Sequence, residues 1–184
     1  MTLKTNGVIW ITGLSGSGKT TLAKEIKKIF INNNNKRIIF LDGDDLREVF
    51  SVNSGLDYDK KTRLELAMKY SKLCNLLSEQ NNIVVIATIS MFYKIYKWNR
   101  KNIQGYFEVY LNASKNDLIK KDPKGIYKKF QEGIIQNVAG FDLKVDEPQK
   151  PDYFIKNDYQ ININQHAVNI VNSFISRYNY DKKN

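Results

Sequence analysis

Short apolar segments alternate with longer amphipathic ones along most of this chain. Residues 7–12, 37–41, 83–87, 106–111 and 159–163 are short and rich in β-branched or aromatic residues, which predicts five strands. Residues 83–87 are the most apolar of these, so we expect this strand at the centre of the sheet. We also expect the strand at 37–41 to be buried.

Helical spacing of apolar residues marks the segments between these strands. It predicts helices over 18–31, 59–80 and 91–104, and a last helix that Asn164 caps. A shorter helix is expected to begin near Asp44, because acidic residues at a helix start complement its dipole. Strands that alternate with helices predict a parallel sheet covered on both faces. We therefore predict an α/β fold with three α/β/α layers and a mainly parallel five-stranded sheet, formed by residues 1–184 as a single domain.

Residues 121–151 break this alternation. They contain all three prolines, their apolar periodicity is weak and lysines are frequent. A long irregular segment inside a compact domain is more often functional than idle, and over a ligand site it acts as a lid. We predict a lid at approximately 121–151.

Composition excludes several classes of protein. Hydrophobic residues make up 42% of the 184, too many for a disordered chain. No apolar run approaches the ~20 residues needed to cross a bilayer, and no signal-peptide pattern begins the chain, so a cytoplasmic protein without membrane contact is expected. Cys74 is the only cysteine and falls in an apolar helical stripe, where we expect it to be buried.

The formal net charge is +10, which suggests a polyanionic partner: either nucleic acid or small molecules rich in phosphate. The lysines are scattered along the chain and do not form a single basic arm, a distribution typical of a solvated surface. Charge alone therefore does not identify a nucleic-acid-binding protein.

Residues 13–20 read Gly-Leu-Ser-Gly-Ser-Gly-Lys-Thr, a complete match to the phosphate-binding P-loop G-x-x-x-x-G-K-[ST]. A predicted strand precedes the motif and a predicted helix follows it, as a P-loop requires. Its N–H groups can surround phosphate oxygens, Lys19 can reach the β- and γ-phosphates of ATP, and Thr20 can place its hydroxyl on Mg²⁺. The fold is then of the P-loop NTPase type. The expected nucleotide-binding residues are Gly13, Leu14, Ser15, Gly16, Ser17, Gly18, Lys19, Thr20 and Thr21.

Chain length and a missing motif narrow the class of P-loop protein. The guanine-specificity motif Asn-Lys-x-Asp is absent, and 184 residues leave little room for the additional parts of a motor protein. A small kinase that uses ATP and Mg²⁺ is therefore favoured over a GTPase or a motor ATPase.

An acidic loop, Asp42-Gly43-Asp44, follows the second predicted strand and should face the P-loop. Phosphoryl transfer to an alcohol needs a group that orients the hydroxyl and takes its proton. His166, the only histidine, lies far along the chain, so Asp42 or Asp44 is the expected base, with Lys19 as the third catalytic residue. Either aspartate could instead help to hold Mg²⁺; Thr20 and Asp42 are our candidate metal site. Arg47, one turn on, could bind an acceptor phosphate.

Three segments resemble the adenylylsulfate (APS) kinases over nearly the whole chain. They are residues 9–12 leading into the P-loop, residues 41–44 with Arg47, and residues 121–129, Lys-Asp-Pro-Lys-Gly-Ile-Tyr-Lys-Lys. Gly-Phe-Asp at 140–142 and a later proline continue the third segment. The resemblance implies transfer of the γ-phosphate of ATP to the ribose 3′-hydroxyl of a nucleotide, under a lid that carries Lys121 and Lys124. It also implies a homodimer.

The chain departs from this family at the acceptor pocket. Two phenylalanines that usually sandwich the acceptor's adenine align with Leu56 and Val138, and an arginine and an asparagine align with Lys60 and Arg63. At 88–91 this chain has Thr-Ile-Ser-Met in place of the family's Phe-Ile-Ser-Pro. Phe92 and Tyr93 are near enough to supply a different aromatic surface for the acceptor's base. The candidate acceptor-binding residues are Asp44, Arg47, Leu56, Lys60, Arg63, Ile89, Ser90, Lys121, Lys124 and Val138.

The residues expected to bind ATP match the family, whereas those expected to bind the acceptor differ from it. This contrast suggests an acceptor nucleotide other than APS. APS-kinase-like proteins also occur in bacterial capsule phosphoramidate pathways, where the acceptor is cytidine 5′-diphosphoramidate. A pyrimidine is smaller than adenine and would suit a pocket that lacks the two aromatic side chains. The alternatives are a true APS kinase that makes PAPS for sulfate assimilation and, in another class, a basic nucleic-acid-binding P-loop protein. We expect a small-molecule nucleotide partner and no nucleic acid.

Overall fold

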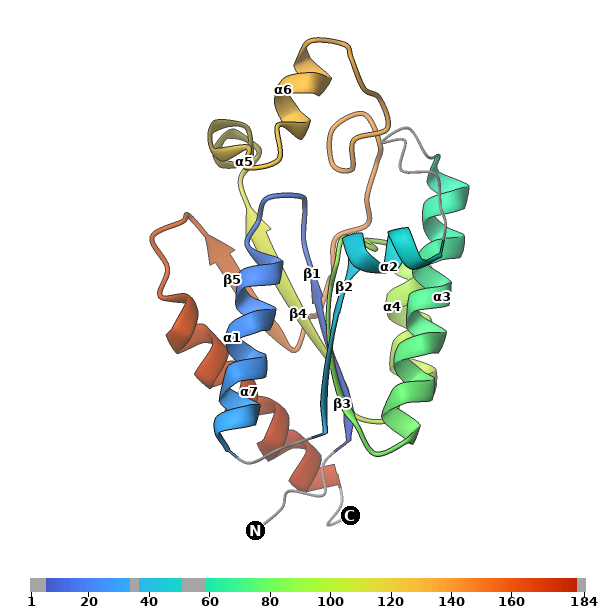
Figure 1. The fold of residues 1–184 in the computed structure, drawn as a ribbon, viewed down its shortest axis with the longest axis vertical. Coiled ribbons are helices and arrows are strands. Elements are labelled where there is room, and N and C mark those ends of the chain that lie inside the picture. Colours follow the sequence, from blue (N-terminus) through green and yellow to red (C-terminus); the bar gives the residue numbers. More distant parts are fainter. Residues whose placement is uncertain (1–5, 34–36, 51–58, 182–184) are drawn as a thin grey trace.

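A computed structural model describes residues 6–33, 37–50 and 59–181. Within them the chain forms one parallel sheet in the order β2-β3-β1-β4-β5, with helices on both faces (Figure 1). The strands are β1 (Gly7–Thr12), β2 (Ile38–Asp42), β3 (Ile83–Thr88), β4 (Tyr106–Ala113) and β5 (Tyr153–Asn157). The helices are α1 (Lys19–Asn32), α2 (Gly43–Val49), α3 (Lys60–Glu79), α4 (Tyr93–Asn102), α5 (Lys115–Lys121), α6 (Ile126–Gln131) and α7 (Ile163–Asp181). The predicted three-layer α/β/α fold is confirmed.

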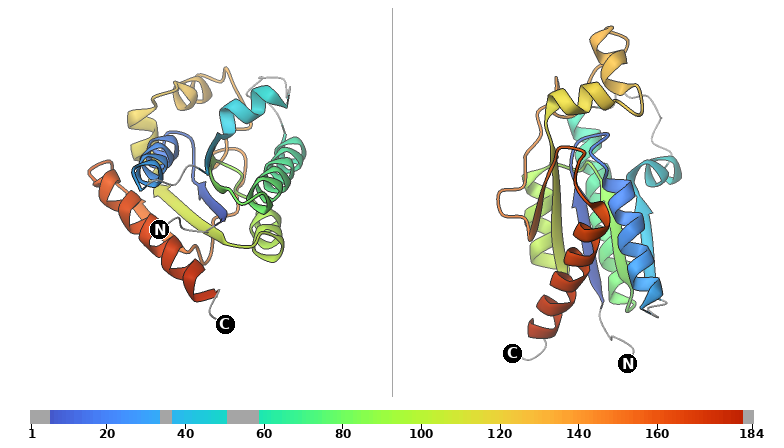
Figure 2. Two further views of the ribbon diagram at one scale, coloured as in Figure 1. Left: turned by 60° about the horizontal axis from the view of Figure 1, so that its bottom comes forward. Right: turned by 90° about the vertical axis from the view of Figure 1, so that its left-hand side faces the viewer.

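Alternation along β1 divides the core into two layers. Ile9 and Ile11 belong to the cluster that contains α1 and α7, whereas Val8 and Trp10 belong to the cluster that contains α3 and α4. All four side chains are fully buried, as expected of a strand in the interior of a parallel sheet. Figure 2 shows the sheet between these two pairs of helices. Cys74 lies in the second cluster and is buried, as predicted.

Three strand predictions need correction. The fifth strand is residues 153–157, not 159–163: Tyr159 has a φ of 64°, which no strand residue adopts. The alternating apolar residues of 159–163 pack on the core without pairing in the sheet. The strand at 83–87 is interior but not central, because β1 lies between it and β4. The strand that begins at Ile38 lies at the sheet edge and is only half-buried.

The last helix also begins earlier than predicted. The side chain of Asn162 accepts a hydrogen bond from the backbone N–H of Gln165 at 3.0 Å, so Asn162, and not Asn164, caps α7. The other long helices agree with prediction to within two residues. The start of α3, for example, is fixed by Asp59, whose carboxylate accepts from the N–H of Thr62 at 2.8 Å.

The segment predicted as a lid lies above the carboxyl ends of the strands, and α6 forms part of it (Figure 1). Its Tyr127 and Val138 form a small hydrophobic cluster with Leu118 of α5. Leu14, from the P-loop, packs against this cluster. In the described part of the chain, no helix combines the length and apolar character needed to span a bilayer.

Candidate active site

The P-loop joins β1 to α1 at the point where the order of strands reverses, which is where open parallel sheets bind ligands. Its first residue must be glycine, because a Cβ on Gly13 would lie 2.3 Å from the backbone oxygen of Leu111. Lys19 begins α1 and is buried, and its Nζ donates to the backbone oxygen of Leu14 at 2.7 Å. The lysine is therefore held over the loop.

Burial, assisted by the positive charge of Lys124, lowers the pKa of Lys19 to about 7, although Asp44 and Asp42 oppose the shift. A phosphate group beside Lys19 would supply negative charge and favour the protonated amine. The lysine is thus placed to respond to an anion bound in the loop.

Asp42 connects the acidic loop to the P-loop. Its Oδ2 accepts a hydrogen bond from Thr20 Oγ1 at 2.7 Å, and its Oδ1 accepts from the N–H of Asp44 at 2.9 Å, which caps α2. Mg²⁺ binds hard oxygen ligands and commonly takes one or two protein groups together with substrate phosphates. Thr20 and Asp42 are an oxygen pair that fits this requirement. No group of three or more metal-binding side chains occurs among the described residues.

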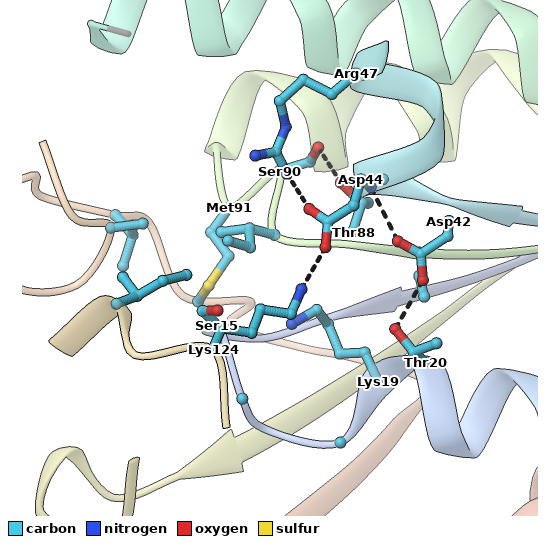
Figure 3. Close-up of a pocket in the computed structure, with 18 of the residues that line it drawn as sticks. Ser15, Lys19, Thr20, Asp42, Asp44, Arg47, Thr88, Ser90, Met91 and Lys124 are labelled. Carbon is cyan, nitrogen blue, oxygen red and sulfur yellow. Dashed lines mark hydrogen bonds and ion pairs between the residues drawn. The ribbon is translucent and has the colours of Figure 1, made fainter. Parts of the chain in front are cut away.

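Asp44 carries two cationic partners, Arg47 on the same helix and Lys124 from the lid (Figure 3). Burial alone would raise the pKa of the Asp44 carboxyl, but the hydrogen bond from Lys124 and the charges of Arg47, Lys124 and Lys19 outweigh burial and hold it below its ordinary value. The carboxylate is therefore ionised at neutral pH and stays half exposed to the cleft.

The end of β3 forms the floor of the cleft between the P-loop and the acidic loop. Thr88 and Ser90 are buried and their hydroxyl oxygens lie 2.8 Å apart, while Ile89 and Ser90 both face the cleft as predicted. Just beyond, the backbone oxygen of Met91 accepts from the N–H of Asp146 at 3.0 Å. This bond attaches the end of the lid to the floor.

The wall opposite the P-loop comes from α3 and the lid. Arg63 lines the cleft and donates from Nη2 to the backbone oxygen of Asn137 at 2.7 Å, beside Val138. The lid side of this wall is mainly aliphatic. Its apolar residues are Ile135, Val138, Ala139, Leu143 and Val145, and Lys144 lies among them. Phe92 also lines the cleft, but Tyr93 does not and is mostly exposed.

Some predicted residues lie elsewhere. Leu56 falls outside the described residues. Lys60 is exposed at the start of α3 and does not line the cleft. Lys121 is also outside it, with its Nζ 5.6 Å from the centre of the Tyr159 ring. Lys124 is the lid lysine that enters the site.

The cleft that these residues form has a volume of about 1230 Å³ and contains the P-loop, the acidic loop and the lid wall. Sites for one small ligand usually enclose ~300–1,000 Å³. There is accordingly room for a donor and an acceptor nucleotide together.

Sequence reasoning missed three residues that contact the P-loop from outside it: Tyr127, Asn157 and Tyr159. Each donates a side-chain hydrogen bond to a P-loop carbonyl. No local pattern marks such residues, because the bonds join positions more than 100 residues apart.

Comparison with known proteins gives a consistent result. Residues 5–156 match the family model for adenylylsulphate kinase. Cytidine diphosphoramidate kinase of Campylobacter jejuni is 38% identical over 159 residues, covering 86% of this chain and 90% of that protein. Adenylyl-sulfate kinase of Pseudomonas aeruginosa is 35% identical over 150 residues, covering 80% of this chain and 75% of that protein. The APS kinase CysC of Mycobacterium tuberculosis, solved in complex with AMPPNP and APS, superposes with a TM-score of 0.81 at 27% identity, covering 91% and 96% of the two chains.

Proposed function

The chain belongs to the adenylylsulphate kinase family and is an ATP-binding nucleotide kinase, and from that premise we propose that its acceptor is cytidine 5′-diphosphoramidate. The reaction would join the γ-phosphoryl group of ATP to the ribose 3′-oxygen of the acceptor and release ADP. The observation that carries the proposal is the aliphatic wall around Val138, a position at which APS kinases usually have a phenylalanine. A single pyrimidine ring needs less stacking surface than a purine.

Arg63 supports the same acceptor. Its guanidinium, held to the lid at Asn137, offers only hydrogen-bond donors. Beside its amino group, cytosine presents two acceptors, N3 and O2, whereas the corresponding edge of adenine presents only one, N1. The relative from Campylobacter jejuni named for this substrate is consistent with a pyrimidine pocket.

In the mechanism we propose, Asp44 and Asp42 have different roles. Asp42 is already engaged by Thr20, and these two would hold Mg²⁺, whose chemistry is to neutralise charge on the β- and γ-phosphates. Asp44 faces the cleft and would accept the proton of the 3′-hydroxyl as that oxygen attacks phosphorus. Lys19 and the P-loop N–H groups would stabilise negative charge on the transferred group.

Lys124 would change partners during this cycle. In the structure it pairs with Asp44, the carboxylate that the acceptor hydroxyl would have to reach. When ATP is bound, the phosphates offer Lys124 a denser negative charge than one carboxylate does. Its departure would free Asp44 for the acceptor and place the lysine at the reacting phosphoryl group.

The test is a coupled assay of ADP release with purified protein and Mg-ATP, offering cytidine 5′-diphosphoramidate and APS in parallel. We expect kcat/KM to be at least about tenfold higher for the cytidine compound, with mass spectrometry showing one added phosphoryl group; tenfold corresponds to ~1.4 kcal/mol, within the ~1–3 kcal/mol that one base-stacking contact contributes. Lys19→Ala should abolish both activities. A preference for APS would overturn the proposed acceptor and leave a true adenylylsulfate kinase, the activity named for the Pseudomonas relative.

A matched pair of variants tests the pocket itself. Arg63→Asn restores the residue type of the resembling family and should narrow the preference for the cytidine compound. Lys61→Asn removes a cation from an exposed position on the same helix and should leave the preference unchanged. Equal effects of the two substitutions would argue against base recognition by Arg63.

A further inference from the structure

All four carbonyl oxygens of residues 14–17, the turn of the P-loop, accept hydrogen bonds. Lys19 supplies the first donor, to Leu14. The other three donors come from outside the loop: Tyr127, Tyr159 and Asn157 donate to the carbonyls of residues 15, 16 and 17 at 2.7, 3.0 and 2.8 Å. A P-loop binds phosphate with its N–H groups, so fixing its carbonyls also fixes the direction of its donors.

Two of these donors are almost completely enclosed. The exposed fraction of Tyr127 is 1% and that of Asn157 is 4%. A buried carbonyl that loses its only donor keeps the full cost of being removed from water. Burial raises the pKa of both tyrosines, with neighbouring negative charge adding to it, so both hydroxyls remain protonated donors at neutral pH.

Tyr127 differs from the other two donors in its location. It belongs to α6 in the lid, whereas Asn157 ends β5 and Tyr159 follows it. The Tyr127 ring packs against Phe141, with centroids 4.7 Å apart, inside the lid's hydrophobic cluster. It does not line the cleft, so its hydroxyl reaches the P-loop from behind.

Other contacts join the same two segments. A Cβ on Gly140 would lie 2.7 Å from both terminal carbons of Leu14, and one on Gly16 would lie 3.3 Å from Pro123. The lid backbone therefore packs directly on the outer surface of the P-loop. Any movement of the loop on nucleotide binding must be transmitted to α6.

We propose that Tyr127 is a positioning residue that couples the P-loop to the lid: its hydroxyl fixes the carbonyl of Ser15 and its ring anchors α6. The inference concerns ATP binding and water exclusion and does not depend on which acceptor the enzyme uses. Removing the hydroxyl should loosen both the phosphate site and the lid.

The experiment compares Tyr127→Phe with Tyr153→Phe. The control removes a similar hydroxyl contact, 3.1 Å from Nδ1 of His166, at the opposite end of β5 from Asn157, which lines the cleft. ATP affinity is measured by titration calorimetry and ATP hydrolysis by phosphate release, both without acceptor, and melting temperature is recorded. We expect Tyr127→Phe to raise the Kd for ATP about three- to tenfold, the effect of one hydrogen bond, and to increase hydrolysis. The control should change neither.

A third variant distinguishes coupling between the P-loop and the lid from support of the P-loop alone. Tyr159→Phe should weaken ATP binding similarly but leave hydrolysis unchanged, because Tyr159 follows β5 and does not belong to the lid helix α6. If Tyr127→Phe keeps wild-type affinity and hydrolysis, or matches Tyr159→Phe in both, the coupling is overturned. Hydrogen exchange on the wild-type protein gives an independent measurement: ATP alone should slow exchange of the α6 amides, and the absence of slowing would also overturn the proposal.

Discussion

The charge of Lys19 depends on what lies beside it. Burial and the neighbouring charge of Lys124 lower its pKa to about 7, so near neutral pH only part of the population carries the charge. A bound triphosphate would return this pKa toward the ordinary lysine value of ~10.4. Binding of ATP is then linked to uptake of a proton.

This linkage predicts a pH profile for ATP affinity. Below pH 7 Lys19 is charged with and without ATP, so its contribution to affinity is constant. From pH 7 upward the free protein has lost a proton that the complex holds, and affinity should fall by up to about tenfold per pH unit. Calorimetry at pH 6.5, 7.5 and 8.5 in buffers of different ionisation enthalpy measures both affinity and proton uptake. A flat profile, or one that Lys19→Ala retains, would contradict this prediction.

Substitution should also separate the two aspartates. Asp44→Asn removes the proposed base and should lower kcat by about 10²–10⁴ with little change in ATP affinity. Asp42→Asn should instead raise the Mg²⁺ concentration needed for half-maximal rate. Initial rates over a magnesium titration distinguish the two, and Asp45→Asn, exposed on the same helix, is the control. The reverse pattern would exchange the two roles.

At the scale of elements, the lid is a packed unit. Gly140 has a φ of 84° and touches Leu14, so Gly140→Ala introduces both backbone strain and a steric clash. Gly133 has a φ of 71° but nothing within 4 Å of an added Cβ, so Gly133→Ala introduces strain of about 1–2 kcal/mol alone. Gly140→Ala should therefore accelerate hydrogen exchange in residues 138–143 more than the control accelerates exchange around its own site. Equal acceleration would mean that the contact with Leu14 does not hold the lid.

The elements differ in how far sequence could predict them. The P-loop was predictable because it is a fixed motif, and the strands on either side of β1 because they are apolar runs, interrupted in β4 by Glu108. β5 was missed because only Ile155 and Asn157 of its five residues are buried, while the alternation of 159–163 reports side-chain packing without strand pairing. Lys121 was expected in the site and Tyr127 was not, since sequence does not show which face of a short helix meets the P-loop.

At the scale of the whole molecule, one polar cluster joins parts that are distant in sequence. Asp152 pairs with Arg100 of α4 and Arg177 of α7, and its Oδ2 accepts the N–H of Glu108 in β4 at 2.8 Å. Arg100 also pairs with Glu108 at 2.7 Å. The cluster lies at the start of β5 and connects both helical layers to the sheet.

Asp152→Asn should therefore destabilise the whole fold. It keeps the side-chain shape but removes the charge that two arginines share, at a cost of about 2 kcal/mol. Urea unfolding followed by circular dichroism measures the loss, and Glu65→Gln, exposed on α3, is the matched control. A loss no larger than that of the control would mean that the arginines find other partners.

The aliphatic wall of the cleft has a consequence for engineering. Ile135, Val138, Ala139, Leu143 and Val145 all come from one uninterrupted stretch of eleven residues, whereas the P-loop and Asp42 belong to separate parts of the chain. Exchanging that stretch between relatives, together with its contact residue Arg63, would replace the cleft wall while keeping the P-loop and Asp42, provided that Gly140, which packs on Leu14, is retained. Under the proposed function, a single short stretch of the chain would therefore carry most of the choice of acceptor.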